Sequence, residues 1–110
     1  EADLWTAGFS FGAYVSLTAG ARDDRVSTLI GIAPALQMYD FAAVKASAKP
    51  KFFVQGEQDE LCPLAHMQSF FDELLPPKQL AVVPGANHLF NGQVEEVATA
   101  LVRLLRTEHP

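Results

Sequence analysis

Four apolar segments, each ended by glycine or proline, alternate along the chain with segments of helical pattern. The predicted strands cover residues 2–7, 26–32, 50–55 and 79–83. The predicted helices cover 11–22, about 41–47, the stretch between Pro63 and Pro76, and the stretch from the cap Asn91 to about Arg106. A strand followed by a helix, four times over, is the pattern of an α/β domain with a parallel sheet. We therefore expect a three-layer α/β/α fold of about four strands.

Two of the predicted helices carry apolar residues at spacings of three and four, which is typical of a helix with one buried face. In the helix that Pro63 opens, these residues are Leu64, Met67, Phe71 and Leu74. In the last helix they are Val94, Val97, Ala98, Leu101 and Leu105. We expect these stripes to pack against the sheet.

Charge and cysteine content exclude several classes of protein. The formal net charge of −5 argues against nucleic-acid binding and against attachment to an anionic membrane. One cysteine excludes an internal disulfide framework and a zinc site with several cysteines. No apolar stretch is long enough to span a bilayer, and residues 1–15 lack the pattern of a signal peptide. These observations predict a cytoplasmic protein with no nucleic-acid or membrane partner.

Three chemically capable residues each follow a predicted strand. Ser10 lies in Gly8-Phe9-Ser10-Phe11-Gly12, Asp59 ends Gly56-Glu57-Gln58-Asp59, and His88 ends Gly85-Ala86-Asn87-His88. Catalytic groups of parallel α/β sheets gather beyond the carboxyl ends of the strands. A serine hydroxyl becomes a nucleophile when a base takes its proton. We expect His88 to be that base and Asp59 to orient it.

The motif around Ser10 has a physical reason for its glycines. A sharp turn from strand to helix lifts the serine Oγ above the sheet, and we expect Gly8 and Gly12 to permit its close packing. The helix that starts at this turn directs backbone N–H groups at the site. The N–H of Phe11 is therefore the expected donor to the oxyanion of a tetrahedral intermediate.

The order Ser10, Asp59, His88 and the loops that carry these residues resemble the C-terminal half of α/β-hydrolases. The stretch from Gly56 to Pro63 is similar to the acid-bearing loop of that family, and 85–90 is similar to its histidine loop. The family fold usually has eight strands, with the nucleophile turn after the fifth. The resemblance thus implies that residues 1–110 form the C-terminal portion of a single α/β-hydrolase domain, a partial α/β-hydrolase fold. It also implies that the loop supplying a second oxyanion donor lies outside this chain.

The same resemblance bears on stability. Strand 2–7 would lie in the middle of the wider family sheet, but in this chain it would be an exposed edge. We therefore expect the isolated chain to be marginally stable or prone to aggregation.

Each candidate has an alternative. Ser10 could be a plain turn residue, and Glu57 and Glu60 compete with Asp59 as the acid. His66 and His109 compete with His88 as the base. His66 lies in a predicted helix and His109 near the chain end, and histidines in such places are more often solvated surface residues. Cys62 could be a nucleophile, but a free cysteine commonly behaves as a small buried apolar residue.

The connection after the second strand bears on the substrate. Met38, Tyr39 and Phe41 in this connection are candidates for substrate binding, with core packing as the alternative. Residues 34–49 are too few for a large cap domain, which predicts an open site for small or exposed acyl substrates.

The sequence thus predicts a serine hydrolase that cleaves an ester, thioester or amide of a small-molecule acyl substrate through an acyl-enzyme. The mechanism requires neither a metal nor an organic cofactor. The alternative is a non-catalytic, truncated fragment of the same fold that acts as a binding or remnant domain. The sequence does not distinguish the acyl group or the oligomeric state.

Overall fold

The computed structural model describes residues 4–108, and it contains one parallel sheet with the strand order β1–β2–β3–β4. Each strand pairs with the strand that follows it in the chain. The strands are β1 (Leu4–Phe9), β2 (Val26–Ile32), β3 (Lys51–Gly56) and β4 (Lys78–Val83). The helices are α1 (Phe11–Arg22), α2 (Ala42–Ala46), α3 (Leu64–Asp72) and α4 (Val94–Glu108). The predicted α/β class is confirmed; Ala2 and Asp3 of the first predicted strand lie outside the described residues.

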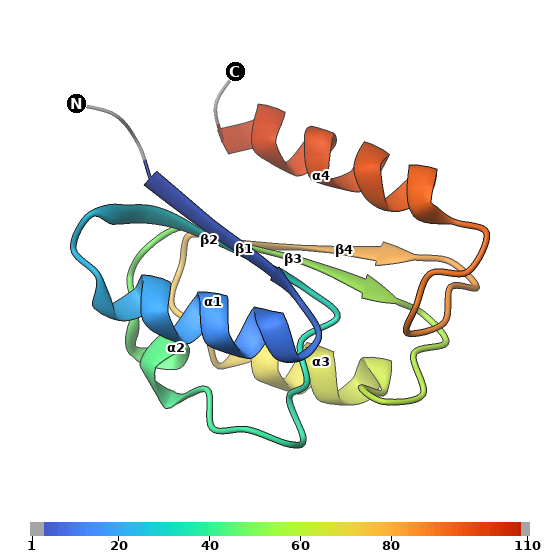
Figure 1. The fold of residues 1–110 in the computed structure, drawn as a ribbon, viewed down its shortest axis with the longest axis horizontal. Helices are drawn as coiled ribbons and strands as arrows, with labels where there is room; N and C mark the ends of the chain where they lie inside the picture. The colour runs from blue at the N-terminus through green and yellow to red at the C-terminus, as the bar shows by residue number, and fades with distance from the viewer. Residues whose placement is uncertain (1–3, 109–110) are drawn as a thin grey trace.

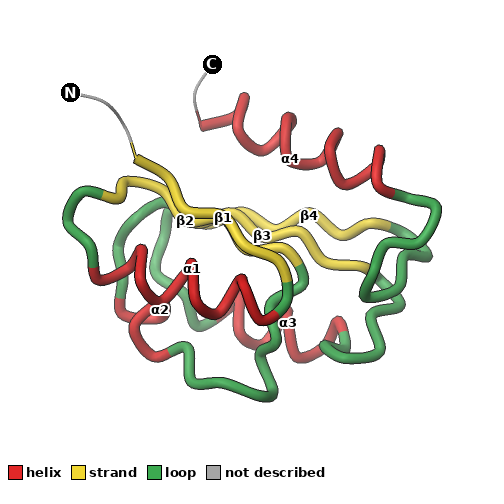
Figure 2. The backbone as a smooth tube through the Cα atoms, in the orientation of Figure 1, coloured by secondary structure: helices red, strands yellow, loops and turns green. Residues whose placement is uncertain are grey.

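The helices form two layers on the sheet (Figure 1). Helices α1, α2 and α3 cover one face, and α4 lies on the opposite face. Right-handed crossovers between consecutive parallel strands place the connecting helices on one side, whereas α4 follows the last strand and connects to no other. The trace in Figure 2 shows the strands as the middle layer. The predicted three-layer arrangement is therefore confirmed.

The apolar core is split by the sheet into two clusters. The larger lies under α1–α3 and includes Leu17, Phe53 and Met67, while the smaller lies under α4 and includes Phe52 and Leu104. All six residues of β3 are buried, as expected for a strand covered on both faces. The edge strand β1 is more open, with Leu4 45% exposed and Phe9 41% exposed.

In two helices, the residues that are buried in the structure differ from the apolar stripe predicted from the sequence. In α3, Phe70 is buried with Met67, whereas Phe71 is only partly buried. In α4, Val94 is 71% exposed and Ala98 is exposed. On the side that packs on the sheet, Leu104 is buried, and Val97, Ala100 and Leu101 are partly buried. Among the described residues, helix α4 packs on β3 and β4, so part of its apolar face does not contact the sheet. The side chain of Leu105 lies outside the described residues.

Among residues 4–108, no helix has the length and apolar character needed to cross a bilayer.

Candidate active site

Ser10 and His88 follow strands at opposite edges of the sheet, yet their side chains meet. Adjacent strands lie about 4.8 Å apart, so β1 and β4 are separated by about 14 Å. The connection between β4 and α4, residues 84–93, reaches the end of β1, where the rings of His88 and Phe90 lie beside Phe9 with centroids 5.3 Å and 6.4 Å from its own. As a result the Oγ of Ser10 lies 2.9 Å from the Nε2 of His88.

The backbone at Ser10 has an unusual conformation for a residue with a side chain. Its φ of 56° and ψ of −117° lie in a region that costs non-glycine residues about 1–3 kcal/mol. The N–H of Ser10 donates to the carbonyl of Ile32 at 2.9 Å, and its own carbonyl accepts the N–H of Ala13 at 3.1 Å. These bonds on neighbouring elements hold the turn in place, so the hydroxyl is directed at His88.

The two glycines on either side of Ser10, Gly8 and Gly12, differ in the space available for a side chain. A Cβ on Gly8 would run into the carbonyl oxygen of Gly12 and would lie 2.8 Å from the N of Ala13. A Cβ on Gly12 would meet nothing within 4 Å. The expectation that both glycines serve close packing is therefore right for Gly8 and wrong for Gly12, because only the strand side of the turn faces backbone atoms.

We predict opposite effects for alanine at these two positions. Gly8→Ala is expected to destabilise the fold by about 3 kcal/mol, since backbone rather than a flexible side chain must move. Gly12→Ala is expected to leave stability unchanged or to raise it by up to about 1 kcal/mol, because alanine favours the helix. Urea unfolding of both variants checks this, and equal losses would contradict the packing argument.

Asp59 is held from two sides. Its Oδ1 accepts the backbone N–H groups of Leu61 at 2.8 Å and of Cys62 at 2.7 Å, and its Oδ2 lies 2.8 Å from Nδ1 of His88. A carboxylate only accepts hydrogen bonds, so Nδ1 is the nitrogen that carries the proton. In a neutral imidazole this leaves Nε2 free to accept the proton of Ser10.

The site lies where the interior meets solvent. Asp59 and His88 are each 4% exposed, whereas Ser10 is half-buried. The ring of Phe9 lies against the imidazole, with 5.3 Å between the ring centroids. Asp59 and His88 are thus shielded from water, while the Ser10 hydroxyl stays within reach of a ligand.

The competing acids and histidines have other partners. Glu57 and Glu60 accept the backbone N–H groups of Gly85 and His88, at 2.9 Å and 3.0 Å. His66 is an exposed residue of α3, and a ring nitrogen lies 3.0 Å from the side-chain amide nitrogen of Gln37. His109 lies outside the described residues. The sequence could not predict these contacts of the two glutamates, because any hydrogen-bond acceptor can bind a backbone N–H.

Cys62 is fully buried. Burial, reinforced by the nearby Asp59 carboxylate, raises the pKa of its thiol from 9.0 to about 11. The nucleophilic form of cysteine is the thiolate, so this residue is a neutral apolar side chain at neutral pH. Its interpretation as a small buried residue is confirmed.

The backbone N–H of Phe11 is the first of helix α1. The first N–H groups of a helix have no partner within the helix, and the helix dipole favours negative charge at this end. The N–H lies next to Ser10 in the chain, where an oxyanion would develop.

The substrate-binding candidates differ in position. Met38 is 67% exposed, and Tyr39 stacks on Tyr14 of α1 and contacts the ring of Phe11, with centroids 4.7 Å and 5.2 Å apart. Phe41 is 4% exposed and its ring meets Phe70 edge-on, so it belongs to the core. The aromatic rings of Tyr39 and Phe11 therefore bring this connection to the Ser10 turn.

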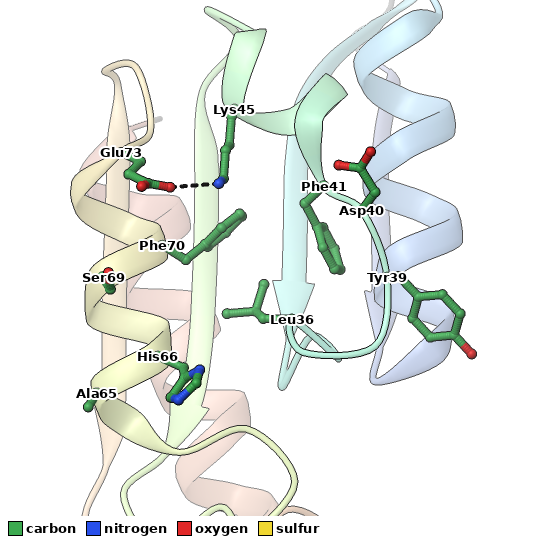
Figure 3. Close-up of a pocket in the computed structure, with 10 residues that line it drawn as sticks. All are labelled: Leu36, Tyr39, Asp40, Phe41, Lys45, Ala65, His66, Ser69, Phe70 and Glu73. Atoms are coloured by element: carbon green, nitrogen blue, oxygen red, sulfur yellow. Dashed lines mark ion pairs between the residues drawn. The ribbon is translucent and has the colours of Figure 1, made fainter.

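A groove of about 500 Å³ lies between this connection and α3 (Figure 3). Leu36, Phe41 and Phe70 point into it, and an ion pair between Lys45 and Glu73 crosses one end at 2.6 Å. Tyr39 points away from α3 in this view. Both charged side chains of the ion pair are about half exposed, so this end of the groove is open to water.

Within residues 4–108, no three His, Cys, Asp or Glu side chains lie close enough together to hold a metal ion.

Comparisons with known proteins agree with this fold. The family model described as PhoPQ-activated pathogenicity-related protein matches residues 9–109. A solved structure of an α/β serine hydrolase homologue from Coxiella burnetii is 41% identical, with a TM-score of 0.84 over 94% of this chain and 49% of that chain. An α/β serine hydrolase without lid from Xanthomonas campestris is 34% identical, with a TM-score of 0.85 over 98% of this chain and 49% of that one.

An uncharacterized protein from Rickettsia prowazekii is 24% identical over 102 residues, covering 86% of this chain and 43% of the relative. The chain thus spans about half the length of the proteins that it matches.

Proposed function

Because the chain belongs to the family described as PhoPQ-activated pathogenicity-related protein and has the α/β-hydrolase fold, we propose that it acts as a serine hydrolase. The substrate is an ester, a thioester or an amide of a small acyl group. The single observation that carries the proposal is the chain of contacts from Ser10 Oγ to His88 Nε2 at 2.9 Å and from His88 Nδ1 to Asp59 Oδ2 at 2.8 Å.

In the first half of the reaction, Ser10 Oγ attacks the carbonyl carbon of the substrate while Nε2 of His88 takes the hydroxyl proton. The Asp59 carboxylate stabilises the imidazolium that forms. The tetrahedral intermediate then collapses, and His88 gives the proton to the departing alcohol, thiol or amine. The acyl group remains as an ester on Ser10.

In the second half, water attacks this ester and His88 again moves the proton, which releases the acid and restores Ser10. The N–H of Phe11 stabilises the oxyanion of both tetrahedral intermediates. Among residues 4–108 this is the one donor that we assign.

The substrate class follows from the connection between β2 and β3. Its only helix in the described structure, α2, has five residues, and Met38 and Tyr39 leave Ser10 half-buried and not sealed. The relative without lid from Xanthomonas campestris supports the same arrangement. We therefore propose a site that takes small acyl groups or acyl groups presented at a surface, with no interfacial lid.

A fluorophosphonate tests the proposal, because it phosphonylates an activated serine. Peptide mass mapping is expected to find one adduct, on Ser10. Ser16→Ala is the matched control: Ser16 lies in helix α1, which begins directly after Ser10, but its hydroxyl donates to the Ala7 carbonyl, so the adduct on Ser10 should persist.

The 110-residue chain is tested beside the longer product if the gene encodes residues before Glu1. Absence of an adduct from every such form would contradict the proposed function.

A further inference from the structure

Two loops at the site touch each other through their backbones. We name residues 57–60 the acid loop and residues 85–88 the histidine loop. The N–H of Gln58 donates to the carbonyl of Ala86 at 2.8 Å. Just before the acid loop, a Cβ on Gly56 would lie 2.5 Å from the Ala86 carbonyl oxygen and 2.9 Å from that of Asn87. The loops thus meet at a distance that only glycine permits at this position.

Two carboxylates of the acid loop reach across this contact. Oε1 of Glu57 accepts the backbone N–H of Gly85 at 2.9 Å, and Oε1 of Glu60 accepts the backbone N–H of His88 at 3.0 Å. Hydrogen bonds from an N–H to a carboxylate are roughly twice as strong as those between neutral groups. Each end of the histidine loop is therefore fixed by one glutamate.

The hydrogen bond that Glu60 accepts comes from the backbone N–H of His88, the residue proposed as the base. His88 belongs to the connection of residues 84–93, which contains no helix or strand. Its imidazole contacts Asp59 at Nδ1 and Ser10 at Nε2, and both contacts depend on where the backbone of residue 88 places the ring. The hydrogen bond between the backbone N–H of His88 and Glu60 limits how far this backbone can shift.

We propose that Glu60 is a positioning residue, a role that rests on the proposed hydrolase function: by fixing the backbone nitrogen of His88, it keeps Nε2 at hydrogen-bond distance from Ser10 Oγ. The acid loop then attaches His88 at two points, through the side chain of Asp59 and through the adjacent side chain of Glu60. Displacements of about 1 Å at reacting groups can cost on the order of 10²-fold in rate.

Glu57 provides a matched control within the same loop. It is the same residue type, its carboxylate accepts the same kind of backbone N–H, and both glutamates are exposed. It differs in binding Gly85, three positions before the base. A general loosening of the histidine loop would affect both variants alike, whereas loss of His88 alignment would affect only the Glu60 variant.

The experiment measures the rate at which a fluorophosphonate labels Ser10, together with kcat and KM for a p-nitrophenyl ester. Glu60→Ala is expected to lower the labelling rate and kcat by about 10- to 100-fold, with KM unchanged within about twofold. Glu60→Gln is expected to recover activity to within about threefold of the wild type, because the amide oxygen accepts the same N–H. Glu57→Ala is expected to stay within about threefold of the wild type.

Three results would overturn the positioning role: wild-type rates in Glu60→Ala, a Glu60→Gln variant as slow as Glu60→Ala, or an equal loss in Glu57→Ala. A wild type that does not react at all overturns the hydrolase proposal, and the role of Glu60 with it. The reactivity of the wild type thus separates the two failures.

Discussion

Replacing Ser10 by alanine is expected to lower the rate of ester hydrolysis by roughly 10⁶-fold, the scale of loss when a serine nucleophile is removed from a triad. The reason is the absence of Oγ, the atom that lies 2.9 Å from His88 Nε2 and that would carry the acyl group. The rate is measured with a p-nitrophenyl ester on the form of the protein that the fluorophosphonate labels. A loss of less than about tenfold would mean that another group is the nucleophile.

Ser10→Gly separates the loss of the nucleophile from any damage to the turn. Glycine adopts a φ of 56° without the steric cost that alanine keeps, so the glycine variant should be the more stable by about 1 kcal/mol. Both variants lack Oγ and should be equally inactive. Unequal activity would indicate that the strained backbone contributes to the rate by itself.

The second large effect is expected for Asp59→Asn, with a fall of about 10⁴-fold in kcat and little change in stability. An asparagine has one accepting oxygen and one donating NH₂. The position of Oδ1 faces the N–H groups of Leu61 and Cys62, so the amide oxygen must occupy it. The NH₂ then faces Nδ1 of His88.

This orientation changes the tautomer of the base. An NH₂ group cannot accept a hydrogen bond from Nδ1–H, so the imidazole proton moves to Nε2, and Nε2 can no longer take the proton of Ser10. Glu57→Gln is the matched control, because it also removes one negative charge from the acid loop but keeps an oxygen for Gly85. We expect its kcat to remain within about threefold of the wild type. Equal losses in the two variants would assign the effect to net charge.

The order of strands and helices could be predicted from the sequence because each element has its own local pattern. The β-branched segment Val26–Ile32 and the glycines and prolines between segments mark the strand ends. Which residues of a helix are buried could not be fixed in this way. In α3 the spacing fits Phe71 as well as Phe70, and only packing on β3 selects Phe70.

The three residues of the candidate site could be proposed from the sequence because the carboxyl ends of parallel strands all lie at the same end of the sheet. Sequence alone could not give the contacts that hold them. Three features depend on tertiary placement: the contact of residues 84–93 with the end of β1, the hydrogen bond from His88 N–H to Glu60, and the open space beside Gly12. None of these leaves a periodic or spaced pattern in the chain.

The order of the strands has a consequence for how the protein acquires reactivity as it folds. Neighbouring strands are consecutive in the chain, so the sheet can grow by one strand and helix at a time through contacts of short sequence separation. The contact between Ser10 and His88 joins residues 78 positions apart and requires both edge strands. A chain in which β4 has not yet docked would have the Ser10 turn without its base. Under the proposed mechanism, the group that accepts the proton of Ser10 is therefore in place only once β4 has joined the sheet.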